Sequence, residues 1–334
     1  MRIAVLGAGA WGSALAIALG RKHGVTLWGR DAAQMQAIAA SRTNQKYLPG
    51  ITLADTVSVT ASFSEALAGA DLALIVTSTS GLADMISATL TETTMAKTAL
   101  PTLPIIWACK GFDKLTGKLP HETIAELVPP GALYGALSGP SFAEEVARGL
   151  PCALTLAAND RVFASEMAGI LNNNTLRVYS SVDLIGVELG GALKNVMAIA
   201  AGISDGMRLG LNARAALITR GLAEMVRLGV AMGGKAETFM GLTGIGDLIL
   251  TATGDLSRNR KVGMLLADGK SLGDILRDLG HVAEGVNSAA AALALAQKHG
   301  VNMPITEAVN AVLFNNADPR DALKALLARD AKAE

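Results

Sequence analysis

The sequence has few of the residues that build metal sites and disulfide frameworks. Cysteine occurs only at Cys109 and Cys152, and the four histidines are scattered without a CxxC or other metal-ligand spacing. Lys plus Arg and Asp plus Glu both total 29, so the formal net charge is zero. Such a chain carries no overall field that would attract nucleic acid or anionic lipid. We therefore expect no metal, no disulfide framework and no nucleic-acid partner.

The sequence also lacks a long hydrophobic run suited to a membrane. The longest charge-free run, Ile3 to Gly20, contains Gly7, Gly9 and Gly12. Glycine inside a helix costs up to about 1 kcal/mol relative to alanine, so this run is a poor spanning helix and a poor signal peptide. The next run, residues 127–143, is broken by three prolines. The sequence thus predicts no stable membrane insertion and a cytoplasmic location.

Small and apolar side chains are abundant, with 36 glycines and 51% hydrophobic residues in 334 positions. This length favours two domains of ordinary size. Over the first 180 residues, short apolar runs alternate with turns and helix-length segments, which predicts βαβ units and a parallel sheet covered on both faces. The expected strands are Ile3 to Leu6, Val25 to Trp28, Val57 to Thr60, Leu72 to Thr77, Pro104 to Cys109 and Leu133 to Leu137, with Cys152 to Ala157 and Leu176 to Tyr179 extending the sheet.

From Ser181 onward, apolar residues recur at helical spacing with no convincing strand between them. The expected helices are Val182 to Ala201, Ala213 to Met232, Leu272 to Leu279, Val286 to His299 and Pro304 to Phe314, with glycine-rich breaks at Gly202 to Gly210 and Gly241 to Gly246. The chain is therefore expected to contain an α/β domain, residues 1–180, followed by an all-helical domain, residues 181–334.

The residues from Gly7 to Gly12, GAGAWG, form a GxGxxG pattern between a predicted strand and a predicted helix. Gly7 permits the tight turn, Gly9 lets the backbone approach a pyrophosphate, and Gly12 allows close packing of helix on strand. The free N–H groups and the helix dipole then bind the anion. The alternative is that these glycines are only packing points. The strand and helix context favours a Rossmann-type dinucleotide-binding domain.

The second predicted strand ends in Gly29-Arg30-Asp31, where such a domain discriminates between cofactors. A carboxylate accepts hydrogen bonds from the adenosine ribose and favours NAD, whereas an arginine pairs with a 2′-phosphate and favours NADP. Arg30 comes first after the strand, and Gly29 is expected to leave space beside it. This order favours NADP and remains compatible with NAD; a solvated Arg–Asp pair on a turn is the alternative.

Two segments near the carboxyl ends of later strands carry candidate substrate ligands. Lys110 follows an apolar strand and should lie at the sheet edge where open α/β folds bind ligands. Gly139 and Pro140 shape a turn after the next strand, and Ser141 is placed to cap a helix containing Glu144. A capping box explains Ser141 by itself, and a helix cap beside the cofactor site is compatible with a second, ligand-binding role.

A single lysine, Lys194, lies within a long predicted helix of the second domain. Gly191 lies one turn before it and Gly190 beside that residue, so we expect bare helix surface that a ligand can approach. Burial should lower the pKa of Lys194 toward the range suited to proton transfer with a carbonyl oxygen. The alternative is a lysine that extends from a core helix to solvent.

Two further polar groups follow glycine-rich or helix-starting positions. Asp247 comes directly after Gly244 and Gly246, and Ser257-Arg258-Asn259 follows ten residues later. Asp247 and Ser257 fit helix N-caps. A hydroxyl, a guanidinium and an amide at a helix start also form an anion clamp, in which arginine gives bidentate contacts.

Seven segments resemble one family when they are read in order. GAGAWGSALA, ACKGFD, LSGPSFAEE, LGGALKNVMAIAAGI, GLTGIGDL, GDLSRNRKVG and VAEGV, over nearly the whole chain, are similar to the bacterial-type NAD(P)-dependent glycerol-3-phosphate dehydrogenases. The resemblance implies reduction of dihydroxyacetone phosphate to sn-glycerol 3-phosphate for phospholipid synthesis. It also implies that Lys194 is the proton donor and acceptor, and that the active enzyme is a homodimer.

The resemblance assigns further site residues. Those matching the family's substrate ligands are Lys110, Gly139, Ser141, Lys194, Asp247, Ser257, Arg258 and Asn259. Those matching its dinucleotide contacts are Trp11, Arg30, Lys110, Ala143, Arg258, Val282 and Glu284, beside the turn residues Gly7, Gly9, Ala10 and Gly12. Two departures are visible, since Ala10 replaces a common serine and Thr77-Ser78 replaces the usual Pro-Ser. The rival hypotheses are a β-hydroxyacid dehydrogenase of similar architecture and a non-catalytic NADP sensor.

Overall fold

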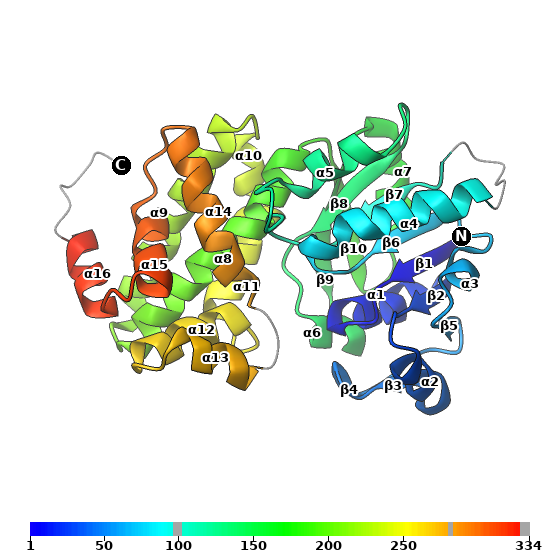
Figure 1. Cartoon of the computed structure of the whole chain (residues 1–334), viewed down its shortest axis with the longest axis horizontal. Coiled ribbons are helices and arrows are strands. Elements are labelled where there is room, and N and C mark those ends of the chain that lie inside the picture. The colour runs from blue at the N-terminus through cyan, green and yellow to red at the C-terminus, as the bar shows by residue number, and fades with distance from the viewer. Residues whose placement is uncertain (96–101, 280–282, 328–334) are drawn as a thin grey trace. The chain divides into compact units, whose positions relative to one another are not determined.

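The structure is a computed structural model and describes residues 1–95, 102–279 and 283–327 (Figure 1). The chain forms two compact units. Unit 1 comprises residues 1–113 and 118–184, and unit 2 comprises residues 114–117 and the described chain from Ile185 onward. The main division therefore follows Leu184, whereas the sequence pattern placed it after residue 180.

Unit 1 is built on an eight-stranded sheet of order β10-β9-β8-β7-β6-β1-β2-β5. Its strands are β1 (Arg2–Leu6), β2 (Gly24–Trp28), β5 (Val57–Thr60), β6 (Leu72–Ile75), β7 (Ile105–Trp107), β8 (Tyr134–Ser138), β9 (Cys152–Ala158) and β10 (Leu176–Ser181). Every expected strand is present. The sheet is nevertheless mixed, because β8 and β9 pair antiparallel. The expected parallel sheet is present from β5 to β8. The sequence pattern did not predict the direction in which β9 extends it, since an apolar run indicates a strand but not its direction.

Unit 1 also contains a small two-stranded sheet that the sequence pattern did not predict. Its antiparallel strands are β3 (Thr43–Asn44) and β4 (Leu48–Thr52). Most of β4 is exposed and contains Pro49 and Gly50, so it lacks the alternating apolar pattern of a half-buried strand. Its presence brings Asn44 into the interior, where that residue is 1% exposed.

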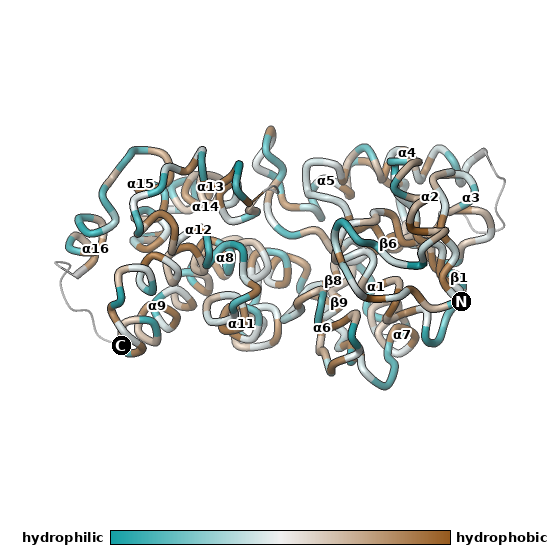
Figure 2. Tube along the Cα trace, turned by 90° about the horizontal axis from the view of Figure 1, so that it is seen from below, coloured by the Kyte–Doolittle hydropathy of each residue, from teal (hydrophilic) through white to brown (hydrophobic). Residues whose placement is uncertain are grey.

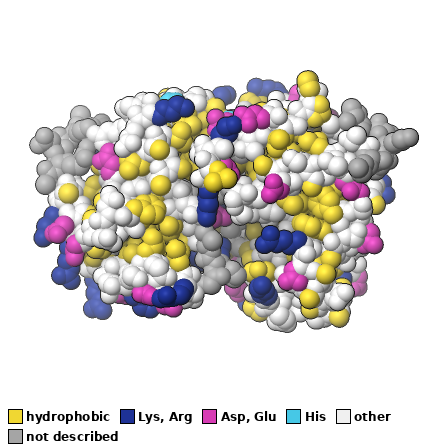
Figure 3. All heavy atoms as spheres, in the orientation of Figure 1, with side chains coloured by type: hydrophobic (Ala, Val, Ile, Leu, Met, Phe, Trp, Pro, Cys, Tyr) yellow, Lys and Arg dark blue, Asp and Glu magenta, His cyan; other side chains and the backbone are white. Residues whose placement is uncertain are grey.

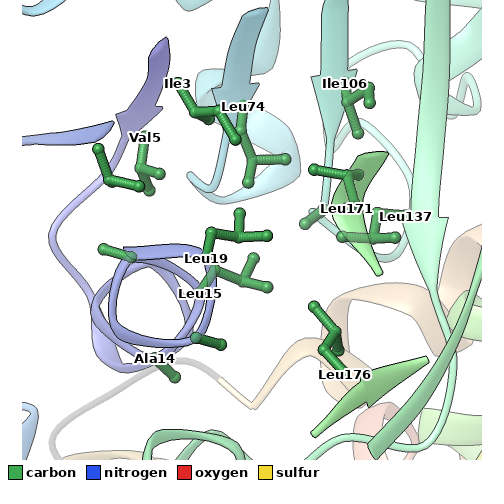
Figure 4. Packing of buried hydrophobic residues seen from close by; sticks show 14 of the residues in the cluster. Ile3, Val5, Ala14, Leu15, Leu19, Leu74, Ile106, Leu137, Leu171 and Leu176 are labelled. Atoms are coloured by element: carbon green, nitrogen blue, oxygen red, sulfur yellow. The ribbon is translucent and has the colours of Figure 1, made fainter. Parts of the chain in front are cut away.

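The helices of unit 1 cover the large sheet. They are α1 (Ala10–Gly20), α2 (Ala32–Ser41), α3 (Phe63–Leu67), the 3-10 turn η1 (Thr79–Gly81), α4 (Leu82–Met95), α5 (Pro120–Leu127), α6 (Ala143–Arg148) and α7 (Arg161–Leu171). Leu15 and Leu19 of α1 pack beneath strand residues such as Ile3 (Figure 4). The hydropathy of β1 is correspondingly high along the trace (Figure 2). This core fixes α1 against the sheet and so places the turn that precedes it.

The described part of unit 2 is helical. Its elements are α8 (Leu184–Gly206), α9 (Gly210–Ala231), α10 (Ala236–Phe239), the π-helical turn η2 (Leu242–Gly246), α11 (Asp247–Thr253), α12 (Arg258–Ala267), α13 (Leu272–Leu279), α14 (Glu284–Lys298), α15 (Pro304–Phe314) and α16 (Pro319–Leu327). Among described residues, only α8 is long and apolar enough to cross a membrane, and 89% of its apolar window is buried inside the protein. That burial makes α8 the core helix of unit 2.

Two glycine-rich segments of unit 2 that were expected to break helices, Gly202 to Gly210 and Gly241 to Gly246, have a different structure. Helix α8 continues through Gly202 and ends at Gly206. A Cβ at Gly202 would overlap the carbonyl oxygen of Arg260, so this glycine allows α12 to pack closely and does not break the helix. The segment from Gly241 to Gly246 is mostly the π-helical turn η2 rather than an open loop. Turns of this kind are rare and occur often at functional sites.

Candidate active site

The GxGxxG turn connects β1 to α1 in unit 1. Gly7 has φ +133°, and an added Cβ would overlap the carbonyl oxygen of Val76; one at Gly12 would overlap the carbonyl oxygen of Gly7. A Cβ at Gly9, in contrast, would meet nothing within 4 Å, and no side chain caps the first turn of α1. Open space beside an uncapped helix N-terminus fits the pyrophosphate of a dinucleotide.

The segment after β2 separates the two residues that bear on cofactor choice. The Asp31 carboxylate caps α2 by accepting a hydrogen bond from the N–H of Gln34 at 3.1 Å. Arg30 is exposed, and among described residues its guanidinium has no polar partner. Gly29 does not leave space for a ligand, because it is buried and a Cβ would lie 2.5 Å from the Met35 sulfur. Its small size serves the packing of α2 on the sheet.

Lys110, Gly139 and Ser141 come together beyond the carboxyl ends of β7 and β8, which are neighbouring strands. The Lys110 ammonium donates to the carbonyl oxygen of Gly139 at 3.2 Å, and the Ser141 hydroxyl donates to the same oxygen at 3.1 Å. The expectation that Ser141 caps α6 is wrong: Phe142 is the N-cap residue and makes no side-chain cap bond. The cluster instead places an ammonium and a hydroxyl at the ligand-binding edge of the sheet.

Lys194 occupies the buried centre of α8 and is 7% exposed. Its ammonium forms an ion pair with the carboxylate of Asp247, the first residue of α11, which is fully buried. It also donates to the Thr251 hydroxyl at 3.0 Å. The carboxylate stabilises the protonated amine and so opposes the effect of burial that the sequence pattern emphasised. Lys194 is therefore a core residue held by polar partners rather than one that extends to solvent.

Thr251 was missed by the sequence interpretation. It lies four residues after Asp247 on α11, and its hydroxyl donates to the Asp247 carbonyl oxygen at 2.6 Å. The i, i+4 spacing places both side chains on one helix face, which is the signal that identifies it. The suggestion that Asp247 only caps a helix is wrong, because the N-cap residue is Gly246 and the carboxylate bonds Lys194.

Gly190 has a different purpose from the expected one. A Cβ at Gly190 would overlap the carbonyl oxygen of Thr243 in η2, so this surface of α8 is covered by backbone and is not open to a ligand. The close contact of α8 with η2 positions the segment that leads directly into Asp247. Gly190 therefore supports the ion pair through packing.

A chain of hydrogen bonds extends from Asn195, beside Lys194. Its amide nitrogen donates to Glu284 at 3.3 Å, and its amide oxygen accepts from Asn259 at 2.9 Å. The Asn259 oxygen accepts from the N–H of Gly285 at 3.0 Å. Asn195 was not among the expected site residues, although its position next to Lys194 pointed to it. These bonds tie α8, α12 and α14 together through the residue that follows Lys194.

The predicted anion clamp lies at the start of α12. Ser257 is the N-cap residue and accepts from the N–H of Arg260 at 3.2 Å. The Asn259 amide is buried in the chain just described, whereas Arg258 is exposed with no polar partner among described residues. Arg258 and the α12 N-terminus are thus the parts of the clamp most accessible to an anion. Val282 lies outside the described residues.

Trp11, Ala143 and Ala10 lie at or near the GxGxxG turn of unit 1. Ala10 begins α1, Trp11 follows it, and Ala143 is the first residue of α6, which packs on α1. Trp11 and Ala143 also pack partly buried against the core. Glu284 is exposed at the start of α14 in unit 2. The structure therefore divides the expected cofactor contacts between the two units.

Two family profiles and the similar proteins named below indicate one family. Residues 2–164 match the family profile for the NAD-dependent glycerol-3-phosphate dehydrogenase N-terminus, and residues 183–324 match the C-terminus profile. The chain is 54% identical, over 335 residues and the whole of both chains, to glycerol-3-phosphate dehydrogenase (NAD(P)+) of Aromatoleum aromaticum. The protein of the same name from Thiobacillus denitrificans is 54% identical over 334 residues and the whole of both chains. A crystal structure of glycerol-3-phosphate dehydrogenase from Coxiella burnetii superposes with TM-score 0.90 at 40% identity, covering 98% of this chain and 99% of that one.

Proposed function

The chain belongs to the NAD-dependent glycerol-3-phosphate dehydrogenase family, and we propose that it reduces dihydroxyacetone phosphate to sn-glycerol 3-phosphate for phospholipid synthesis. It is an NAD(P)-dependent oxidoreductase acting on a CH–OH group. The observation that carries the assignment of roles is the buried Lys194–Asp247–Thr251 cluster. A buried ammonium with two fixed polar partners is suited to proton transfer at a carbonyl oxygen.

The residues of the chain supply binding, orientation and the proton. The dinucleotide, when bound, supplies or accepts the hydride. Lys194 donates a proton to the substrate carbonyl oxygen in the reducing direction and takes it back in the other. Asp247 and Thr251 hold the Lys194 amine in place. After Lys194 has lost its proton, the nearby Asp247 carboxylate favours reprotonation of the amine.

The phosphate of the substrate is assigned to the start of α12. Arg258 offers a guanidinium that is exposed at the first helical residue, and Ser257 offers the cap hydroxyl. Arginine at a helix N-terminus combines charge, bidentate geometry and the helix dipole. Asn259 acts mainly by fixing Asn195. Lys110, with Gly139 and Ser141, is assigned to the polar end of the substrate. Binding the non-reacting phosphate orients the carbonyl and so contributes to the rate.

We propose that NADP is preferred over NAD. The support is that the Asp31 carboxylate caps α2, whereas Arg30 is exposed and available to a 2′-phosphate. Arg30→Glu should raise the Michaelis constant for NADPH far more than that for NADH. Steady-state kinetics with each cofactor measures the ratio, and equal effects on both would contradict the preference.

A direct assay tests the activity against its rivals. NADPH absorbance should fall when enzyme and dihydroxyacetone phosphate are both present. This turnover should be far faster than the oxidation of 3-hydroxyisobutyrate by the same enzyme with NADP. Preference for the hydroxy acid would favour the β-hydroxyacid dehydrogenase. Binding of NADPH without turnover on either substrate would favour a sensor.

We also propose that the protein is a cytoplasmic homodimer. Unit 2 exposes several large apolar side chains, among them Leu211 at 73% and Met240 at 62% exposure, which would be covered in a symmetric pair. On the face drawn in Figure 3, acidic and basic side chains are interspersed rather than gathered into a patch of one sign. Light scattering coupled to size exclusion should give about twice the mass of the 34.2 kDa chain; the mass of a single chain would refute the dimer.

A further inference from the structure

Asn44 connects the small β3–β4 sheet to the GxGxxG turn. Its side chain is 1% exposed, and its amide nitrogen donates to the carbonyl oxygen of Ala8 at 3.0 Å and to the Ser13 hydroxyl at 2.8 Å. Ala8 lies between the first two glycines of the turn, and Ser13 lies in the first turns of α1. One buried amide therefore holds both the turn and the helix that follows it.

A second amide reaches the same carbonyl group. Gln34, from α2, donates its amide nitrogen to the Ala8 oxygen at 3.3 Å. Neither residue belongs to the GxGxxG pattern or to the expected cofactor contacts. Two donors from separate elements thus fix the direction of a single carbonyl bond.

The direction of that carbonyl bond decides where the next N–H points. A trans peptide is planar, and its C=O and N–H bonds point in opposite directions. The Ala8 oxygen faces the buried Asn44 amide, so the N–H of Gly9 faces away from it. No cis peptide occurs in the described chain. Gly9 is also the turn residue whose missing Cβ leaves open space.

We propose that Asn44, assisted by Gln34, is a positioning residue that orients the Ala8–Gly9 peptide so that its N–H donates to the cofactor pyrophosphate. This inference rests on the proposed function, because it takes the turn to be the dinucleotide site. The amide is required rather than a carboxylate: an oxygen in place of the Asn44 nitrogen would face the Ala8 oxygen and repel it. Asn44→Asp keeps the size of the side chain and reverses this interaction.

The test compares three substitutions that each convert an amide to a carboxylate in the full-length protein. N44D and Q34E alter the two donors to Ala8. Q45E is the matched control, because Gln45 lies next to Asn44 and its exposed amide bonds only the Thr43 hydroxyl in the described structure. NADPH affinity is measured on the protein without substrate, by fluorescence titration. The Michaelis constant for dihydroxyacetone phosphate and kcat are measured at saturating NADPH, and Tm is recorded for each variant.

We expect N44D to weaken NADPH binding about tenfold or more, the effect of replacing a buried hydrogen bond by repulsion. Q34E should weaken it about threefold, and Q45E should stay within about twofold of the wild type. The kcat and the Michaelis constant for dihydroxyacetone phosphate should change less than about twofold in N44D, because the turn binds only the cofactor.

Other outcomes separate the possible failures. A wild type that binds no NADPH overturns the proposed function itself. If the wild type binds NADPH and N44D binds it as tightly as Q45E, only the positioning role is overturned. The same holds if N44D lowers Tm without changing the affinity of its folded fraction. If N44D does not fold, Q34E decides: weaker binding than Q45E supports the role, and equal binding overturns it.

Discussion

The GxGxxG turn of unit 1 and the Lys194–Asp247 pair of unit 2 are candidate sites built in different ways. Unit 1 presents backbone N–H groups at the start of a helix that no side chain caps. Gly7 and Gly12 shape the turn before it, because a Cβ at either position would overlap a backbone carbonyl oxygen. Unit 2 buries charged and polar side chains, with Lys194 paired to Asp247 inside a helical core. A backbone site depends on the path of the chain, whereas a side-chain site depends on charge balance. Substitutions should therefore have different consequences in the two units.

The largest effect is expected from removing the Lys194 amine. Lys194→Ala should lower kcat by about 10³-fold or more, within the range of lost general acid–base catalysis, and leave NADPH affinity nearly unchanged. Stopped-flow and steady-state kinetics, with a fluorescence titration for binding, measure both. Lys298→Ala, at an exposed position near the end of α14, is the control. Turnover within a few-fold of the wild type would eliminate the assigned role.

The next effect concerns the stability of the charged core. Asp247→Asn leaves the Lys194 ammonium buried without its countercharge, which should lower the free energy of unfolding by about 3–5 kcal/mol. The double variant Lys194→Met, Asp247→Leu should recover much of this stability while remaining inactive. Denaturant unfolding measures both proteins. Equal stability of Asp247→Asn and the wild type would show that the pair is not energetically coupled to folding.

A matched pair of glycine substitutions tests the backbone site. Gly9→Ala meets open space, so Tm should stay near that of the wild type while NADPH binding weakens about tenfold, because the added methyl group occupies the approach of the phosphates. Gly12→Ala overlaps the Gly7 carbonyl oxygen and should lower both Tm and binding. Thermal melts and titrations separate the two. Similar losses of Tm in both variants would argue against a distinct role for Gly9.

A further effect is a pH dependence that arises in unit 2. Glu224 of α9 is 1% exposed and accepts hydrogen bonds from the backbone N–H groups of Ile305 and Thr306. Burial raises its pKa from 4.5 to about 7, although these hydrogen bonds act in the opposite direction. Between these values the folded form holds a proton that the unfolded chain has released. Stability should therefore fall as pH rises from about 4.5 through about 7, by at most about 3 kcal/mol.

Amide hydrogen exchange, corrected for its intrinsic pH dependence, measures this effect separately in each unit. Protection of α9 and α15 should decline with pH in the wild type and become flatter in Glu224→Gln, while β1 and α1 serve as the internal reference. An unchanged slope in Glu224→Gln would assign the pH dependence to another group.

The sequence pattern supplied most of the elements but not all of their relations. All eight strands of the large sheet were expected, because buried strands are short apolar runs between turns. The antiparallel pairing of β8 with β9 was not, since direction depends on the connection between strands. The β3–β4 sheet was missed because β3 has only two residues and β4 is mostly exposed and contains proline and glycine. Consequently no local signal pointed to Asn44, whose amide bonds Ala8 from that sheet.

The candidate site shows the same division. Lys194, Asp247 and the α12 start were expected from charge in apolar helices and from glycine-rich turns. The pairing of Lys194 with Asp247 was not expected, because the two residues are 53 positions apart. A local sequence pattern cannot predict a contact over that separation. Gly190 was assigned the wrong local role for the same reason, because the carbonyl group that it packs against belongs to the distant residue Thr243. Ser141 was also misassigned, although its partner is local: its hydroxyl donates to the carbonyl oxygen of Gly139, two residues earlier, and does not cap the helix.

The sequence by itself determined the scarcity of metal ligands, the balanced charge, the alternation that becomes a Rossmann-type sheet, and the GxGxxG turn. These properties are local or additive, so they can be read along the chain. Only the tertiary structure decided that Asp247 neutralises Lys194, that Asp31 caps a helix while Arg30 faces solvent, and that Asn44 reaches Ala8. Each depends on burying polar atoms from distant segments against one another, and the free energy of such a contact exists only when both partners are in place.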